Sequence, residues 1–193
     1  MNPITHFFIS WDAANIDDFD KRDRLLLTVS GIIPDADGFG ALPELLTMNS
    51  ENPIIWFSKY HRLLTHNISF GIIFTIFVFF VAHKKFKTAI FSLFLFNIHL
   101  FCDIIGGAGP DGSYWPVPYL LPFSDKWQLY WEHQWLLNAW QNILITITAI
   151  IIMFIFAYKK GYSFIEIFSQ KADKLFVNTV RNRIDYFKKI FCK

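Results

Sequence analysis

Histidines and aspartates able to bind a metal ion lie in several short stretches of the first 111 residues. Imidazole nitrogen and carboxylate oxygen, with no cysteine among them, suit Zn²⁺ or a related divalent ion such as Mn²⁺ or Fe²⁺. The stretches hold more donors than one tetrahedral ion needs, which leaves room for two or three ions. Such a cluster would activate water and clamp the oxygens of a phosphodiester during in-line attack. The candidate residues are His6, Asp35, Asp37, His61, His66, His99, Asp103 and Asp111.

His99 and Asp103 are the most informative pair, because they lie within the apolar run "FNIHLFCDIIGG". Four residues apart, they share one face of a helix and can bind a single ion together. Burying a carboxylate without a partner costs several kcal/mol or forces it to take up a proton. We therefore expect a bound cation beside His99 to offset the charge of Asp103.

The aspartate pair Asp35 and Asp37 flanks one residue in "PDADGFG". Proline and glycine on either side suit a tight loop that can turn both carboxylates inward. The alternative is a turn or a helix N-cap, in which the same side chains bind backbone N–H groups. His6 stands near the beginning of the chain without a partner in sequence, and a structural role is its alternative.

His61 and His66 lie in "YHRLLTHN", just before an apolar segment. Five residues place them about 140° apart round a helix, so one continuous helix would not aim both at one point. They converge if His61 precedes the helix and His66 lies on its first turn, or if two metals are held; otherwise both are interfacial side chains. His133, in "WEHQW", has no partner at a useful spacing, and its participation stays open.

Three apolar segments must position these residues: 68–82, 88–105 and 143–158. A helix needs about 20 apolar residues to cross a bilayer, with about 17 as the lower limit. The segments are at or just under that limit, so core helices of a soluble α-domain are the alternative. Apolar residues make up 53% of the chain and phenylalanine occurs 23 times, which favours a membrane protein.

Charge divides the chain in the way expected of membrane spans. The loop 83–87 and the residues after 158 carry twelve Lys/Arg and three Asp/Glu. Residues 1–67 and 103–142 carry six Lys/Arg and thirteen Asp/Glu. The positive-inside rule then places the basic loop and tail in the cytoplasm. All seven tryptophans lie on the acidic side, as in an interfacial aromatic belt. We predict an all-α membrane bundle of about three spans, with its N-terminus and metal site at the outer face.

The domain organisation follows from the same pattern. Residues 1–160 form one domain, and 161–193 form a basic amphipathic cytoplasmic tail. The segment 106–124 is rich in glycine and proline and cannot be a long helix. Cys102 and Cys192 belong to no spaced set, so neither a disulfide nor a thiolate metal site is expected. The N-terminal stretch has no basic region or long apolar run of a signal peptide.

Several blocks together resemble bacterial membrane-bound metal-dependent hydrolases, a family grouped with zinc-dependent phospholipase C. The blocks are "PDADGFG", "YHRLLTHN", "HLFCDIIGGAGPDGSYWPVPYLLPFS" and "QWLLNAWQN", and they cover most of residues 1–142. The resemblance implies an all-helical fold and an integral protein of the bacterial inner membrane. It also implies metal ligation by His6, Asp35, Asp37, His61, His66, His99 and Asp103, with Asp111 either a ligand or an acceptor that fixes its loop.

The function expected from these residues is hydrolysis of a phosphoester in a lipid or lipid-linked substrate. Asp35 or Asp37 is the candidate general base toward an activated water. The alternative is a non-catalytic membrane protein whose metal site is structural, since only an open coordination position separates the two. A cation transporter fits less well, because its sites lie near the membrane midplane. No nucleic-acid partner is expected, because the basic tail matches membrane topology and carries no recognition motif.

Overall fold

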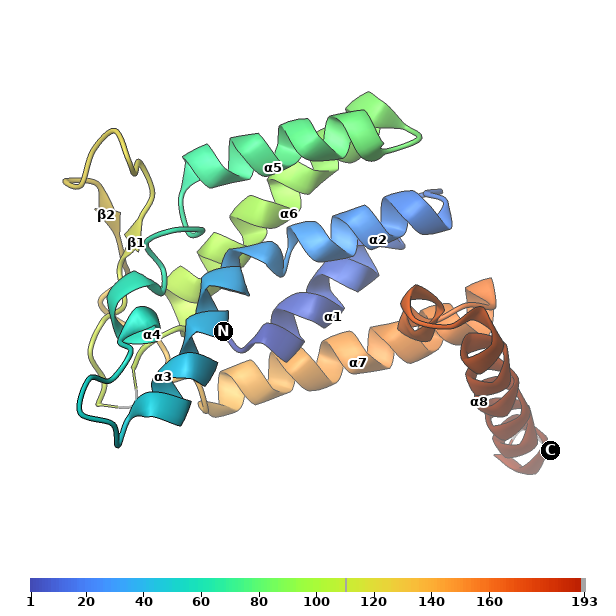
Figure 1. Ribbon diagram of the computed structural model, residues 1–193. Helices are drawn as coiled ribbons and strands as arrows, with labels where there is room; N and C mark the ends of the chain where they lie inside the picture. The colour runs from blue at the N-terminus through green and yellow to red at the C-terminus, as the bar shows by residue number, and fades with distance from the viewer. Residues whose placement is uncertain (110, 192–193) are drawn as a thin grey trace.

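Helices account for nearly all of the regular structure, which confirms the expected all-α class (Figure 1). The computed structural model describes residues 1–109 and 111–191. Five longer helices lie side by side in a bundle, and a sixth projects from one end of it (Figure 1). They are α1 (Pro3–Ala14), α2 (Lys21–Ser30), α5 (Ile68–Val81), α6 (Lys85–Gly106), α7 (Trp140–Lys160) and the projecting α8 (Gln170–Phe191).

Short elements gather at the end of the bundle where the chain begins, here named the site end. The 3₁₀ helix η1 (Ile33–Gly40) follows α2, and α3 (Ala41–Thr47) and α4 (Trp56–Tyr60) come next. Beside them an antiparallel pair joins β1 (Val117–Pro118) to β2 (Gln128–Leu129). β1 falls in the segment 106–124, whose described residues beyond the last turn of α6 are not helical, as expected. The opposite end, named the basic end, holds the turns α1–α2 and α5–α6, then η2 (Phe164–Ile167) and α8.

Two helices, α6 and α7, are long and apolar enough to cross a membrane. A third candidate is the pair formed by α2 and the helical stretch Ile33–Thr47, which is bent by 55°. The helix α5 has only 14 residues, fewer than the roughly 17 that a span requires. The expected three spans are therefore supported as two or three candidates, and the segment 68–82 is too short to be one by itself.

The first thirty residues form a helical hairpin inside the bundle, which corrects the expectation that residues 1–67 all lie outside the spans. α1 runs from the site end along α7, and α2 returns beside α6 (Figure 1). Their turn meets the loop between α5 and α6, where Asp17 lies 2.5 Å from Lys87 and Asp20 lies 2.6 Å from His83. The sequence conceals this hairpin because α1 and α2 are too short to resemble spans and are buried against other helices rather than lipid.

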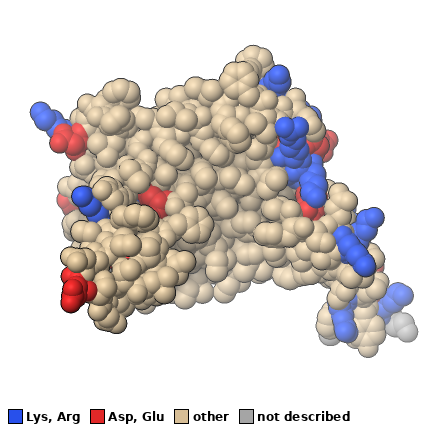
Figure 2. All heavy atoms as spheres, viewed as in Figure 1, with Lys and Arg blue, Asp and Glu red and all other residues tan. Residues whose placement is uncertain are grey.

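The charge asymmetry survives this correction. With residues 12–24 and the C-terminal segment counted at the basic end, that end carries fifteen Lys/Arg and eight Asp/Glu, whereas the site end carries three and eight. Figure 2 shows the basic side chains gathered toward this end and over α8, with few charges on the face between the two ends. The positive-inside rule still favours a cytoplasmic basic end.

Close packing around α6 turns its polar side chains inward. Phe96 and Leu100 pack with Val117 in one apolar cluster. Gly71 lets α5 approach, because a Cβ atom there would lie 2.7 Å from the Phe96 ring. On the face toward α2, Ser92 accepts a hydrogen bond of 2.8 Å from the Ser30 hydroxyl. The burial of this helix on several sides leaves the face of His99 and Asp103 away from lipid.

The C-terminal segment begins by packing on the bundle and then leaves it. Arg24 of α2 makes two hydrogen bonds of 2.8 Å to the carboxylate of Glu166 in η2, and both side chains are largely buried. Ser163 bonds to Asp173 and thereby fixes the start of α8. The predicted helical tail is present as α8, whereas Cys192 lies outside the described residues.

Candidate metal centre

α6 supplies the first two donors, His99 and Asp103. Both are 1% exposed and, being one turn apart, share a face as predicted. His99 Nδ1 lies 2.8 Å from the carbonyl oxygen of Gly31. A carbonyl can only accept, so Nδ1 carries a hydrogen and Nε2 is the nitrogen left to bind a metal ion. This Nε2 lies 3.4 Å from Asp103 Oδ2. In known metal sites a bond from the other ring nitrogen orients the ligand, as the bond from Nδ1 to Gly31 does here.

The connection between α4 and α5 supplies His66. His61 ends α4 and His66 precedes Asn67, the N-cap of α5, so neither histidine lies within a long helix. Between them Arg62 has φ of 68°, a left-handed conformation that reverses the chain. The reversal brings His66 Nε2 within 3.3 Å of Asp103 Oδ2. The first arrangement considered from sequence is right for His61, which precedes α5, but His66 lies just before the N-cap of that helix and not on its first turn.

The 3₁₀ helix η1 supplies the aspartates, in place of the loop that the sequence suggested. Asp35 Oδ1 lies 3.6 Å from His99 Nε2 and 3.7 Å from His66 Nε2. Asp37 points to the other side of His66: its Oδ2 is 3.5 Å from His66 Nδ1, and its Oδ1 is 2.9 Å from His61 Nδ1. Asp35 therefore faces the convergence point, whereas Asp37 joins the two histidines behind it.

Four atoms thus converge from three elements: Asp35 Oδ1, His66 Nε2, His99 Nε2 and Asp103 Oδ2. The four nitrogen–oxygen separations among them run from 3.3 to 3.7 Å. Donors about 2.0–2.1 Å from a tetrahedral Zn²⁺ stand roughly 3.4 Å apart, which matches these distances. His66 Nε2 and His99 Nε2 are also buried without a hydrogen-bond partner. A buried ring nitrogen without a hydrogen-bond partner is costly, and a cation at the centre would bind both nitrogens.

His66 titrates unusually in this setting. Burial lowers the pKa of its imidazole, but the carboxylates of Asp103, Asp35 and Asp37 outweigh burial and raise the pKa to about 10. Without a metal ion, His66 therefore holds a proton at neutral pH. An ion must displace that proton to reach the Nε2 lone pair.

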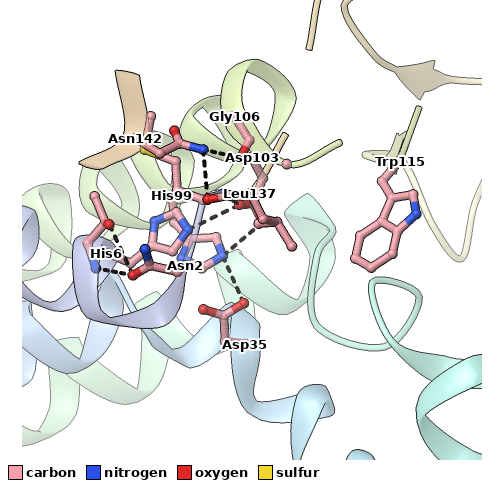
Figure 3. Close-up of polar contacts among 12 residues, drawn as sticks. Asn2, His6, Asp35, His99, Asp103, Gly106, Trp115, Leu137 and Asn142 are labelled. Atoms are coloured by element: carbon pink, nitrogen blue, oxygen red, sulfur yellow. Dashed lines mark hydrogen bonds and ion pairs between the residues drawn. The ribbon is translucent and has the colours of Figure 1, made fainter. Parts of the chain in front are cut away.

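His6 and the N-terminus complete the surroundings of Asp103. His6 Nε2 lies 3.1 Å from Asp103 Oδ1, and its ring stacks on His99 at 3.8 Å between centroids. The Met1 amine also pairs with Asp103 Oδ1. Figure 3 shows His6, Asp35, His99 and Asp103 turned toward one another. His6 thus contacts the second oxygen of Asp103 and lies outside the set of four.

Two residues named from the sequence lie apart from this centre. The exposed Asp111 accepts hydrogen bonds from Ser113, including one of 2.7 Å from its hydroxyl, and so fixes its own loop. His133 is exposed and its ring meets Trp131. Of the eight candidates, the structure brings four into one group, places His6, Asp37 and His61 in contact with it, and leaves Asp111 away from it.

Family membership accords with this architecture. The family model described as "YdjM inner membrane protein" matches residues 1–172. The chain belongs to the YdjM inner membrane protein family. No curated protein and no solved structure gives a significant match. Membership in the YdjM family supports the expected inner membrane location, but the family description names neither a hydrolase nor a phospholipase C. Those parts of the resemblance therefore stay predictions.

The YdjM match covers a residue that the sequence reasoning missed, Arg62. Its guanidinium is 3.8 Å from Asp103 Oδ2, donates to the Trp115 carbonyl at 3.0 Å and lies 4.6 Å over the Trp115 ring. The side chain is buried, and its Nε–H has no partner. The sequence could have pointed to Arg62 through its position inside "YHRLLTHN", between the two candidate histidines. A positive group therefore stands beside the donors.

A second acidic group of this YdjM-family chain lies at the basic end and has a structural explanation. Asp20, Asp23 and His83 approach one another closely enough to hold an ion. However, the Asp23 oxygens already accept hydrogen bonds from the backbone N–H groups of His83 and Lys84, at 2.8 and 2.9 Å. Asp23 also accepts from the Thr88 hydroxyl at 2.9 Å. Its carboxylate thus caps the start of α6 and ties α2 to the α5–α6 turn.

Proposed function

We propose that this protein is a membrane-bound, metal-dependent hydrolase that cleaves a phosphoester of a lipid or lipid-linked substrate. One observation carries the proposal: the donor group borders an apolar cavity of about 870 Å³. Asp35, His61 and Arg62 all line that cavity. Ligand sites in proteins typically enclose about 300–1,000 Å³ with a few convergent polar groups, and this cavity meets both criteria.

The chain's own residues divide the work at this centre. A divalent ion held by Asp35, His66, His99 and Asp103 would supply Lewis acidity and lower the pKa of water. Asp35 Oδ2 has no hydrogen-bond partner, and Asp35 lines the cavity, so this oxygen can accept a proton from water. Asp37 has both oxygens engaged by histidines. We therefore assign the general base to Asp35 and make Asp37 a positioning residue.

Arg62 supplies the recognition of phosphate. Its Nε–H is unpartnered and its guanidinium stands on the cavity wall beside the donors. A guanidinium matches the oxygens of a phosphate better than a point charge does. The Trp115 carbonyl and ring hold Arg62 in place, so little side-chain freedom is lost when a phosphate binds.

The charge asymmetry supports a periplasmic position for the site end. The basic end belongs in the cytoplasm by the positive-inside rule, and the donors lie at the opposite end. A lipid phosphate of the outer leaflet would then meet the cavity directly. The substrate headgroup beyond the phosphate is not constrained by these residues.

A structural metal site is the second candidate, because four protein donors already complete a tetrahedral set. Closed four-donor sites are typical of structural zinc, whereas catalytic sites keep one position open. The cavity beside Asp35 and Arg62 favours the hydrolase. Asp35, His66, His99 and Asp103 would hold the ion in either case, and a hydrolase would need the ion to bind water or substrate in addition.

Metal content and phosphate release test the proposal together. We expect the purified protein in detergent to hold at least one zinc or manganese per chain and to release phosphate from lipid phosphates in mixed micelles. His99→Ala removes an inner donor, so it should lose the ion and the activity. His133→Ala removes an exposed histidine and should lose neither. Full metal content without turnover of any phosphoester lipid favours the structural site, and a folded protein without metal contradicts both.

A further inference from the structure

The cavity beside the donor group extends from the donors along the first half of α1 to the segment that follows α7. At the site end it is lined by Asp35, His61 and Arg62. Next to them comes Val29 in the last turn of α2, then the first half of α1 up to Phe8, and the cavity ends against η2. The lining also includes Ile4, Phe7, Ala36, Phe164 and Phe168.

The two ends of this cavity differ chemically. The charged groups that line it, Asp35 and Arg62, both lie at the site end, beside the four donors. The far end is aromatic: Phe164 meets the rings of Phe7 and Phe8 edge to face at 5.7 and 5.4 Å. The cavity therefore has a small polar region at the site end and a larger apolar region beyond it.

We propose that this cavity holds the hydrocarbon chain of the substrate along the first half of α1, with the lipid phosphate at Arg62 and the chain end near Phe164 and Phe168. The inference rests on the proposed function for the phosphate end only. It adds the substrate class, a long-chain lipid phosphate recognised by its chain as well as by its head.

A hydrocarbon chain fits this wall better than a peptide does. A peptide brings backbone N–H and C=O groups, and each one left unpaired in an apolar cavity costs free energy. Away from the site end the lining side chains, such as Phe8 and Phe164, offer no polar partner. A methylene chain needs none, and each buried methylene contributes about 0.8 kcal/mol, or roughly fourfold in affinity.

The rim of the cavity also fits a lipid as occupant. Phe39 at the site end is 81% exposed and Phe168 at the far end is 76% exposed. In a bilayer, lipid covers such side chains without cost. The hairpin lies against α6 and α7, the two helices able to span the membrane, so the cavity lies beside the acyl region.

Binding of monoalkyl phosphates to the zinc-loaded protein tests this inference without requiring turnover. Radiolabelled probes of 4, 8, 12 and 16 carbons are compared in one detergent. We expect wild-type affinity to rise about fourfold per methylene until the cavity is filled. Val29→Trp places a large ring in the cavity and should weaken the 16-carbon probe at least tenfold while leaving the 4-carbon probe unchanged. Ile73→Trp adds the same ring on the exposed face of α5 and should change the affinity for neither probe. Because both variants are measured in the same detergent, this control accounts for partition of the probes into the micelle.

Each outcome is decisive. Wild-type affinity of Val29→Trp for the 16-carbon probe overturns the proposal, as does inorganic phosphate binding as tightly as that probe. Should Val29→Trp lose zinc and thus its fold, Ile4→Trp replaces it, because Ile4 lines the cavity yet is 61% exposed, close to the 65% of Ile73. Binding that depends on the cavity without any phosphate release supports the chain site and contradicts the hydrolase. Phosphate release that does not depend on chain length supports the hydrolase and contradicts the chain site.

Discussion

His99 donates its Nδ1 hydrogen to the carbonyl oxygen of Gly31 over 2.8 Å, which links α6 to the end of α2. The bond selects the tautomer whose Nε2 faces Asp35 and Asp103. Gly31 can lie there because it has no side chain: a Cβ atom would stand 1.6 Å from Ser10 Oγ and 2.6 Å from Ser10 Cβ. The orientation of a donor on one helix thus depends on close packing between two others.

Gly31→Ala should therefore impair both stability and metal binding. The added methyl overlaps Ser10, and overpacking of this kind costs about 1–3 kcal/mol. Because φ at Gly31 is −88°, backbone strain is not involved. The melting temperature in detergent and the zinc content measure the two effects. The double variant Gly31→Ala/Ser10→Gly should regain most of both, and a double variant as impaired as the single one contradicts the steric explanation.

Asp37→Asn should weaken metal binding without abolishing it. Asp37 contacts His66 Nδ1, on the side of the ring away from the centre, and also His61 Nδ1, so it orients the donor His66 rather than binding the ion. Loss of such an outer partner typically costs about 10- to 100-fold in metal affinity. Competition with a zinc chelator measures the change. Asp35→Asn should lose the ion outright, Asp111→Asn should behave as wild type, and equal effects of the first two substitutions contradict the division of roles.

Zinc binding should release about one proton per ion near pH 7.5. The carboxylates around His66 raise its pKa to about 10 against burial, so the metal-free protein binds a proton there. The pKa of His66 is about 6.5 in the unfolded chain and about 10 in the folded protein, and the stability changes with pH between these two values. The metal-free fold is most stable below that window and loses this contribution as the pH rises through it, whereas zinc affinity rises with pH. Calorimetry in buffers of different ionisation enthalpy counts the protons, and no release contradicts the protonated state of His66.

The N-terminal hairpin makes a prediction about topology that differs from the charge pattern alone. Asp18 lies in the α1–α2 turn, where its carbonyl oxygen accepts from Lys84 of the α5–α6 turn. In a Cys102→Ala/Cys192→Ser background, Asp125→Cys at the site end should react with a membrane-impermeant maleimide in intact cells. Asp18→Cys should react only after the membrane is broken. Labelling of both in intact cells would restore the exported N-terminal segment and contradict the hairpin.

Much of the candidate site can be read from local spacing. A separation of four residues on one apolar helix is sufficient to place His99 and Asp103 on one face, and both are indeed buried together. The chemistry of the donor set likewise depends only on residue type. For Asp35 and Asp37 spacing fails, because η1 is a 3₁₀ helix, not a loop or strand, and sends the two carboxylates to opposite sides of His66.

The sequence by itself determined the helical class, the long apolar helices, the charge asymmetry and the residues rich in metal donors. These follow from periodicity, composition and side-chain chemistry, which are local properties. Only the tertiary structure decided that α1 and α2 enter the bundle, that Arg62 stands beside Asp103, and that an apolar cavity reaches the donors. Each of these depends on contacts between segments distant in the chain, such as Gly31 with His99, and no local pattern encodes such contacts.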